Sequence, residues 1–209
     1  MTDPAGGPPA PQGSGNWQTP PPPTPAPGGF DPASFKQAAV EAGPAPGVAY
    51  ADLVTRVIAI VIDSVILWIP WIIVWTIVAG AFVLSGGFGF AIIGLVLGVI
   101  WAAVTAAYFV WTWTTMRASY GQKFLKLETV NAADGATLTR DQAIKRWAFL
   151  FGPNAVAMVA SNVLGLLGSL VSLLVLVYVI YLLYTASQSP KRQGFHDVQA
   201  ATVVVKRLA

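Results

Sequence analysis

Asp63 is the residue whose type and position in the sequence could do chemistry. It is the only formal charge between Arg56 and Arg117, in a run of hydrophobic residues. An unpaired carboxylate inside a membrane-spanning helix costs roughly 2.5 to 3.5 kcal/mol on insertion scales. We therefore expect Asp63 to be protonated, paired or in contact with water. Burial would raise its pKa and allow it to take up and release a proton.

Hydroxyl groups at helical spacing could complete a site around this carboxylate. Thr105, Tyr108, Thr112 and Thr115 follow each other at intervals of three or four residues, which places them on one stripe of a helix. If the stripe meets Asp63, the hydroxyls and carbonyls would suit a proton or a small hard cation. The alternative is that hydrogen bonds hold Asp63 and fix the packing of the helices. A later series of hydroxyls is similar and comprises Ser172, Tyr178, Tyr181 and Thr185.

Arg56 lies on the same helix face as Asp63. Their separation of seven positions places the two side chains about 10 Å apart along a helix axis. A direct pair therefore requires the arginine to bend toward the aspartate. Asp52 is four residues before Arg56, and this spacing predicts an ion pair between those two side chains.

His196 and Asp197 are the remaining neighbours with possible chemistry. His196 is the only histidine and the chain has no cysteine, so the residue types predict no zinc site and no other metal site. We expect His196 and Asp197 to cap or orient a turn, with Asp197 paired to Arg192 or to a basic residue of 117–146. A pH-sensing role for His196 is the alternative. Motifs of hydrolases, phosphate-binding loops and dinucleotide sites are missing from the sequence, so we expect no enzymatic activity and no cofactor.

The composition indicates that a membrane surrounds most of this chain. Of its 209 residues, 55% are hydrophobic and 10% are charged, whereas a soluble domain carries roughly a quarter charged residues. No Asp, Glu, Lys or Arg lies between Asp63 and Arg117, or between Arg146 and Lys191. Both stretches exceed the ~20 apolar residues that span a bilayer. We predict an all-α membrane protein, a small helical bundle of about four membrane-embedded helices with a short cytoplasmic β element.

The hydrophobic stretches divide into helices at their glycines and polar residues. Residues 147–186 could form one long tilted helix or two short ones. Two are favoured, because a single helix would place the basic C-terminal segment opposite the basic 117–146 segment, against the positive-inside tendency. Pro70 should kink the first helix. The predicted helices are about 54–82, 90–116, 142–160 and 166–185.

The polar segment 117–141 and the C-terminal residues predict a little β structure. Alternating residues on both sides of Asp134-Gly135 favour a small β-hairpin. The C-terminal residues 201–206 read as a strand that could pair with residues 126–130. That pairing requires both segments to lie on the same side of the membrane.

The first 48 residues differ in composition from the rest. They are rich in proline and glycine, which predicts a disordered tail with one possible interfacial helix between Asp31 and Ala42. No secretory signal precedes Tyr50, so we expect this tail in the cytoplasm. The charge distribution then predicts an inner or plasma membrane protein with both termini cytoplasmic.

Partners are expected at the basic segments and the tail. Anionic lipid headgroups should contact the basic residues beside the hydrophobic segments, and a protein could bind the proline-rich tail. Small residues recur every fourth position from Gly94 to Ala106, which favours close helix packing or, less directly, a homo-oligomer. No nucleic-acid partner is expected. The basic residues concerned are Lys123, Lys126, Arg140, Lys145, Arg146, Lys191, Arg192, Lys206 and Arg207.

Three stretches taken together resemble the RDD family of bacterial membrane proteins over residues 49–206. They are Tyr50-Ala51-Asp52-Leu53-Val54-Thr55-Arg56 with Ile62-Asp63-Ser64, then Gly121-Gln122-Lys123-Phe124-Leu125-Lys126-Leu127, then Ser189-Pro190-Lys191-Arg192-Gln193-Gly194-Phe195-His196-Asp197.

The resemblance implies which residues give the family its name. Its arginine and two aspartates would correspond to Arg56, Asp63 and Asp197. Family members usually have a further glycine in the stretch that matches Gly121 to Leu127, and here Phe124 and Leu125 follow the lysine. Gly121 and His196 are expected to serve as structural turn residues.

Two functions follow from the sequence. The chain is interpreted first as an accessory or scaffold membrane protein with a proline-rich tail and a basic cytoplasmic face. The alternative is a small transporter or cation/proton exchanger that uses Asp63 with Thr105, Tyr108 and Thr112. The resemblance is compatible with both, because the family is mostly uncharacterised and some members are associated with cation or proton transport.

Overall fold

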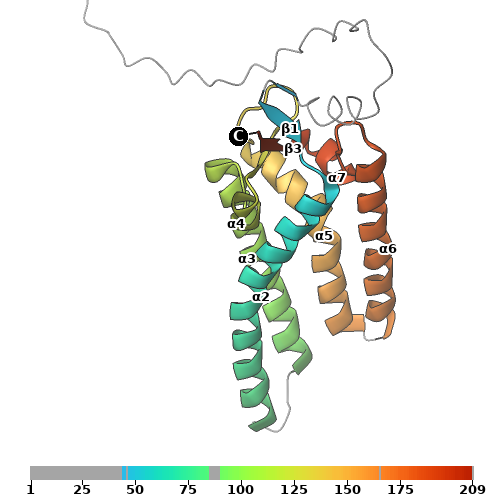
Figure 1. Ribbon diagram of the computed structural model, residues 1–209. Coiled ribbons are helices and arrows are strands. Elements are labelled where there is room, and N and C mark those ends of the chain that lie inside the picture. Colours follow the sequence, from blue (N-terminus) through green and yellow to red (C-terminus); the bar gives the residue numbers. More distant parts are fainter. Residues whose placement is uncertain (1–43, 46, 85–89, 165, 209) are drawn as a thin grey trace, which may run out of the picture.

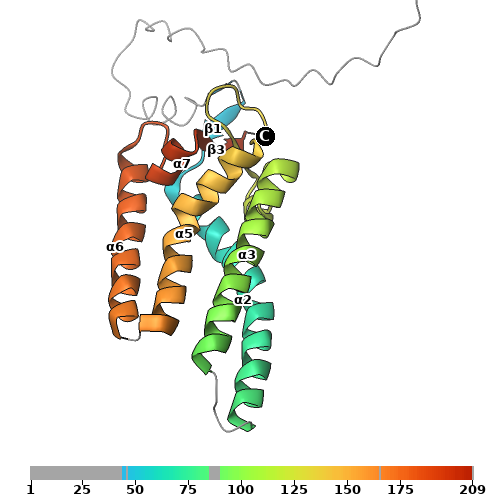
Figure 2. The same ribbon diagram turned by 180° about the vertical axis from the view of Figure 1, so that it is seen from behind.

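Four long helices and a small sheet make up most of the part of the chain that the structure describes (Figure 1). The structure, a computed structural model, describes residues 44–45, 47–84, 90–164 and 166–208. Two pairs of neighbouring helices run side by side, and α3 of the first pair packs against α5 of the second (Figures 1 and 2). The helices are α2 (Leu53–Leu84), α3 (Phe90–Met116), α5 (Arg140–Leu164) and α6 (Leu166–Gln188).

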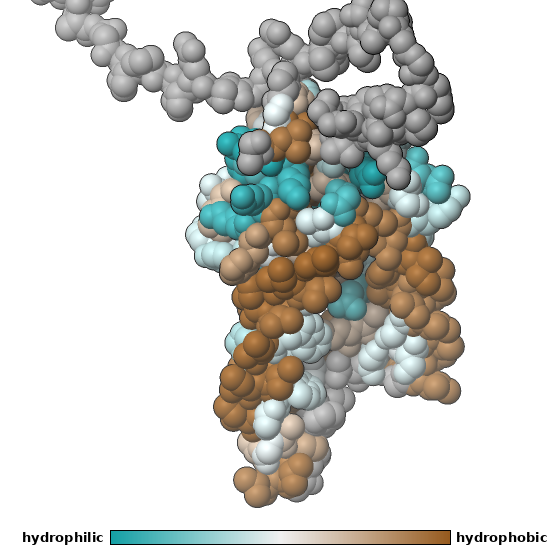
Figure 3. Space-filling view, viewed as in Figure 1, coloured by the Kyte–Doolittle hydropathy of each residue, from teal (hydrophilic) through white to brown (hydrophobic). Residues whose placement is uncertain are grey.

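Three of these helices are long and apolar enough to cross a membrane. By length and composition they are Leu53–Leu84, Ile92–Met116 and Leu166–Gln188. Their outer faces carry exposed valine, leucine and isoleucine side chains, and Figure 3 shows hydrophobic residues over most of the helical part. This distribution is that of a protein whose helices face lipid. The fourth helix, α5, differs because its first two turns contain Arg140, Asp141, Lys145 and Arg146.

Proline residues lie inside two of the long helices. Pro70 is in α2 and Pro153 is in α5, where each removes a backbone hydrogen bond and crowds the preceding turn. Both helices change direction along their length (Figure 1). The bends make α2 and α5 tilt across the bundle near the sheet and run more nearly parallel beyond it.

The segment from 147 to 186 forms two helices and not one, as the charge distribution favoured. Helix α5 starts at Arg140, because Thr139 and Gln142 exchange capping hydrogen bonds of 3.1 and 3.2 Å. It continues past residue 160 to Leu164, where the hydroxyl of Ser161 donates back to Ala157 O at 2.8 Å. Helix α6 packs closely against this end, since a Cβ atom on Gly168 would lie 2.4 Å from the Cα of Ser161.

The sheet has three antiparallel strands in the order β1-β3-β2. They are β1 (Val48–Tyr50), β2 (Leu127–Asn131) and β3 (Thr202–Arg207). The predicted pairing of the C-terminal strand with residues 126–130 is confirmed, with Leu127 opposite Lys206 and Asn131 opposite Thr202.

The predicted β-hairpin around Asp134-Gly135 is wrong. Residues 131–136 form a turn, in which Gly135 N donates to Asn131 O at 2.9 Å and Gly135 has a φ of 68°. The residues after the turn form no strand, because Thr139 is already engaged in capping α5. The partner of β2 is therefore β3, which arrives from the far end of the chain.

Three short elements were not predicted. Strand β1 starts at Val48, inside the segment interpreted as tail, and the helices α4 (Tyr120–Phe124) and α7 (Phe195–Gln199) each have five residues. We call β1, β2, β3, α4 and α7 the platform, which lies at one end of the long helices (Figure 1). The tail helix expected between residues 31 and 42 and the glycine loop 85–89 lie outside the described residues.

Small apolar side chains form the core where α2 meets the platform. Ala51, Ala59, Leu127 and Val204 are buried together. A second cluster between α3 and α5 is aromatic and includes Phe109 and Trp113. The core therefore lies mainly at the sheet end, where it fixes the first turns of α2 and the last turns of α3 near the platform.

Candidate functional site

Asp63 is buried where α2 contacts α4 of the platform. Its side chain is 1% exposed. One carboxylate oxygen accepts hydrogen bonds from the hydroxyl of Tyr108 at 2.6 Å and from Gly121 N at 2.8 Å. The other accepts from the hydroxyl of Ser119. All three donors are uncharged, and they come from α3 and from the start of α4.

The start of α4 is built to present these donors. Ser119 is the N-cap and exchanges capping bonds with Gln122, while Gly121 N is one of the first backbone donors that a helix leaves free. Gly121 also allows the close approach, because a Cβ atom there would lie 2.1 Å from Ala59 O. Asp63 therefore stabilises the crossing of α2 and α4, and the predicted structural role of Gly121 has a steric basis.

The second buried carboxylate, that of Asp197, lies between two arginines. It is 0% exposed. Arg56 Nη1 lies 3.1 Å from Asp197 Oδ2, and Arg146 Nη1 binds Asp197 Oδ1. The predicted pairing of Asp197 with a basic residue of 117–146 is thus confirmed in Arg146, whereas Arg192 offers only its backbone carbonyl, to Arg56.

Arg56 connects α2 to two elements of the platform and to the residue that follows β1. Besides Asp197 of α7, it donates to Ala51 O at 3.2 Å and to Val204 O of β3 at 2.9 Å. The predicted ion pair with Asp52 does not form among the described residues. Asp52 instead accepts two hydrogen bonds from Thr55, which caps the start of α2 and turns Asp52 away from the arginine.

Arg146 is a functional candidate that the sequence interpretation placed wrongly. It was grouped with the basic residues at headgroups, yet it is 3% exposed and its guanidinium lies 5.1 Å from the ring centroid of Trp113. The burial follows from its position in the second turn of α5, where it faces Asp197 and Thr202. No sequence pattern distinguishes that orientation from one toward solvent.

His196 lies next to the same cluster. Its Nε2 is 3.6 Å from Asp197 Oδ1. Burial holds the pKa of His196 well below its ordinary value of 6.5, and the positive charges of Arg146 and Arg56 lower it further. The imidazole is therefore neutral at neutral pH. Among the described residues, no group of three His, Cys, Asp or Glu side chains gathers as for a metal ion.

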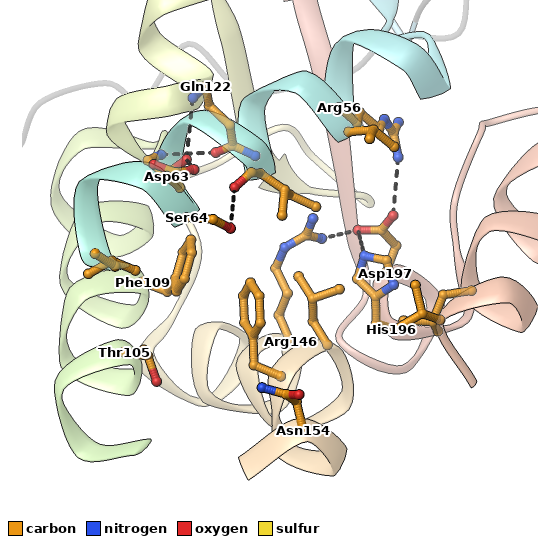
Figure 4. A pocket seen from close by; sticks show the side chains of 18 of the residues that line it. Arg56, Asp63, Ser64, Thr105, Phe109, Gln122, Arg146, Asn154, His196 and Asp197 are labelled. Atoms are coloured by element: carbon orange, nitrogen blue, oxygen red, sulfur yellow. Dashed lines mark hydrogen bonds and ion pairs between the residues drawn. The ribbon is translucent and has the colours of Figure 1, made fainter. Parts of the chain in front are cut away.

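A cavity of about 320 Å³ connects the two buried carboxylates. It lies between the long helices, with Asp63 and Gln122 on one side, Asp197 and His196 on the other, and Arg146 rising between them (Figure 4). Away from this polar end the walls are apolar and aromatic. They include Leu67, Trp68, Trp101, Phe109, Leu150, Phe151, Val175 and Val179.

The predicted hydroxyl stripe only partly reaches this site. Tyr108 binds Asp63, and Thr105 lines the cavity. The hydroxyls of Thr105 and Thr112, however, donate to backbone carbonyls of their own helix at 3.0 and 3.1 Å. The stripe on α6 does not meet Asp63, because Tyr178 donates to Phe149 O.

The fold and these buried charges define a class of protein. It is an integral membrane protein of two packed helical pairs, whose internal carboxylates attach the helices to a small sheet. The model of the RDD family matches residues 50–201, so the chain belongs to the RDD family, as the sequence motifs suggested. No curated protein and no solved structure matches the chain.

Proposed function

We propose that this chain is an accessory membrane protein whose platform presents a fixed surface to lipids and partner proteins. The supporting observation is that the three side chains assigned to the family motif form hydrogen bonds within the protein. Arg56, Asp63 and Asp197 are buried, and their hydrogen bonds attach α2 to α4, α7 and β3. These contacts stabilise the platform and leave the motif charges engaged within the protein.

The exposed basic residues indicate on which side of the membrane the platform would lie. Figure 3 shows hydrophilic residues gathered at the sheet end, and an excess of lysine and arginine marks cytoplasmic segments. We therefore place the platform and both termini in the cytoplasm of an inner membrane. Anionic headgroups would contact its exposed side chains, namely those of Lys123, Lys126, Arg140, Lys145, Lys191, Arg192, Lys206 and Arg207.

The proline-rich segment belongs to the same proposed face. Residues 1–43 precede β1, an edge strand of the sheet that pairs with β3. A protein that binds proline-rich sequence would thereby be brought to the platform.

Transport through Asp63 is the second candidate. It is favoured by the cavity, which Asp63 and Thr105 both line. It is disfavoured by the three donors on Asp63, because taking up a cation or a proton would break hydrogen bonds to Tyr108, Ser119 and Gly121.

Cation-dependent proton flux into liposomes separates the two candidates. Wild-type protein and Asp63→Asn are reconstituted to equal density, and each is tested with the common monovalent ions. The proposal expects no flux from either protein. Flux in the wild type that disappears in Asp63→Asn would overturn the accessory role and assign transport to Asp63.

Deletion of residues 1–43 in cells tests the accessory role from the other direction. The deletion ends before β1, so that the sheet keeps all three strands. We expect a strain with the shortened chain to show the phenotype of a strain without the protein, while Asp63→Asn complements. Full complementation by the shortened chain would contradict a role that depends on the tail.

A further inference from the structure

Arg146 has hydrogen-bonding capacity that the protein does not use. Its Nη1 donates to Asp197 and to Thr202, whereas its Nε is buried without a partner. Within the described part of the chain, its Nη2 donates no hydrogen bond either. Because Arg146 lines the cavity, its Nη2 is available to an oxygen of a carboxylate or phosphate there.

The cluster around Arg146 has two positive groups and one negative group. Arg56 and Arg146 share the single carboxylate of Asp197. Asp63, on the other side of the cavity (Figure 4), forms no ion pair with either arginine among the described residues and accepts hydrogen bonds from Tyr108, Ser119 and Gly121. A buried guanidinium without a carboxylate of its own is unfavourable, and an anion beside it would offset that cost.

The cavity that Arg146 lines indicates what kind of anion fits. Apolar and aromatic side chains form most of its walls, which suits a hydrocarbon chain and not a hydrated inorganic ion. Trp68 of α2 and Val179 of α6 line the cavity and are also partly exposed on the outer surface. Figure 3 shows a hydrophilic patch at the bottom of a hollow between hydrophobic walls. The cavity is thus open sideways, toward the surface that faces lipid.

Size and depth restrict the occupant further. A cavity of about 320 Å³ is at the lower end of the range for small-molecule sites, so it holds a headgroup and the start of a chain. The remaining hydrocarbon must leave through the opening between α2 and α6. Arg146 lies in the second turn of α5, close to the platform, which corresponds to the level of lipid headgroups.

We propose that this cavity binds one anionic phospholipid of the surrounding membrane. The phosphate accepts a hydrogen bond from the free Nη2 of Arg146, and the acyl chains pass between Trp68 and Val179 into the bilayer. The lipid supplies the negative charge that the cluster of Arg56, Asp197 and Arg146 lacks. The site is independent of whether the protein transports an ion.

Native mass spectrometry of the purified full-length chain tests this site. The protein is exchanged into detergent with phosphatidylglycerol or with phosphatidylcholine, and bound lipid is counted after washing. We expect wild type to retain one phosphatidylglycerol and no phosphatidylcholine. Arg146→Lys keeps the charge toward Asp197 but loses the free Nη2 donor, so its affinity should fall about tenfold.

A second variant keeps the test valid if Arg146→Lys folds poorly. Val179→Trp fills the opening from an exposed position on α6, and Val177→Trp is its control, because Val177 is exposed and does not line the cavity. We expect Val179→Trp to lose the retained lipid and Val177→Trp to keep it.

Several results would overturn the proposal. Equal retention of phosphatidylcholine would show that charge is not recognised, and retention by Val179→Trp would place the lipid outside the cavity. Displacement of the lipid by inorganic phosphate at millimolar concentration would identify the site as one for a free anion.

Discussion

Asp63 and Asp197 are both carboxylates with almost no exposure, yet the protein surrounds them differently. Asp63 is held by three uncharged donors, whereas Asp197 is held by two guanidinium groups. Uncharged donors can rearrange around a neutral amide, but a guanidinium cannot change its charge at physiological pH. We therefore expect the site of Asp63 to tolerate replacement of the carboxylate by an amide, and the site of Asp197 not to tolerate it.

The two sites also join residues with different separations along the chain. Asp63 binds Gly121, 58 residues away, and it fixes a crossing of neighbouring elements. Asp197 binds Arg56, 141 residues away, and it joins the two ends of the family domain. Loss of the second site should weaken the attachment of α2 to α7 and β3.

Asp197→Asn should give the largest effect. It leaves Arg56 and Arg146 buried without a negative charge, and removing one partner of a buried ion pair costs about 3 to 5 kcal/mol. We expect a large fall in the melting temperature in detergent, with loss of monodisperse protein. Asp141→Asn is the control, because Asp141 is exposed. Equal melting temperatures for the two variants would contradict the role of Asp197.

Gly121→Ala tests the other site through its backbone. The new methyl would lie 2.1 Å from Ala59 O, so α4 must move away from α2, at a cost of about 1 to 3 kcal/mol. The melting temperature in detergent measures this loss. Gly80→Ala is the matched control, since a Cβ atom at Gly80 meets nothing within 4 Å. The steric account fails if both variants melt like wild type.

Asp63→Asn should be milder than either substitution. The amide oxygen can still accept from Tyr108 and Gly121, and the hydroxyl of Ser119 can rotate to accept from the amide nitrogen. We expect a loss of about 1 kcal/mol in the free energy of unfolding. A larger loss than that of Asp197→Asn would reverse the comparison between the two sites.

The cluster around Asp197 should also respond to pH. His196 faces Asp197, Arg146 and Arg56, and burial and the arginines lower its pKa in the folded protein. The unfolded state therefore binds the proton more readily, so stability is fully present above about pH 6.5 and declines as the pH falls below it.

Melting temperatures between pH 7.5 and pH 5 check this decline. The slope contributed by His196 cannot exceed about 1.4 kcal/mol per pH unit. His196→Gln removes the titrating group and should flatten the curve. An unchanged slope in that variant would assign the decline to other groups.

The features predicted well were those set by long patterns or by solvation. The bounds of α3, the division of residues 147–186 and the pairing of β3 with β2 follow from runs of hydrophobic residues and from the placement of charges. The burial of Asp63 follows in the same way, because an acid in such a run must find partners.

The elements that were not predicted are too short to give such a pattern, and the contacts that were not predicted join residues far apart in the sequence. A three-residue strand and two five-residue helices give no periodicity to detect. The capping pair Ser119 and Gln122 was a usable signal for α4. The contact of Arg146 with Asp197 spans 51 residues, and nothing local in α5 distinguishes it from a contact with a headgroup.

The long separation between Arg56 and its partners has a consequence for biosynthesis. Arg56 leaves the ribosome 141 residues before Asp197 and 148 before Val204. The first helical pair must therefore enter the membrane with this arginine still unpaired. A chain that stops after α6 would contain every long helix and still lack its last carboxylate and β3. Such a product would have no buried counterion for Arg56 and Arg146, so the attachment of α2 and α5 is completed only when the last residues have been made.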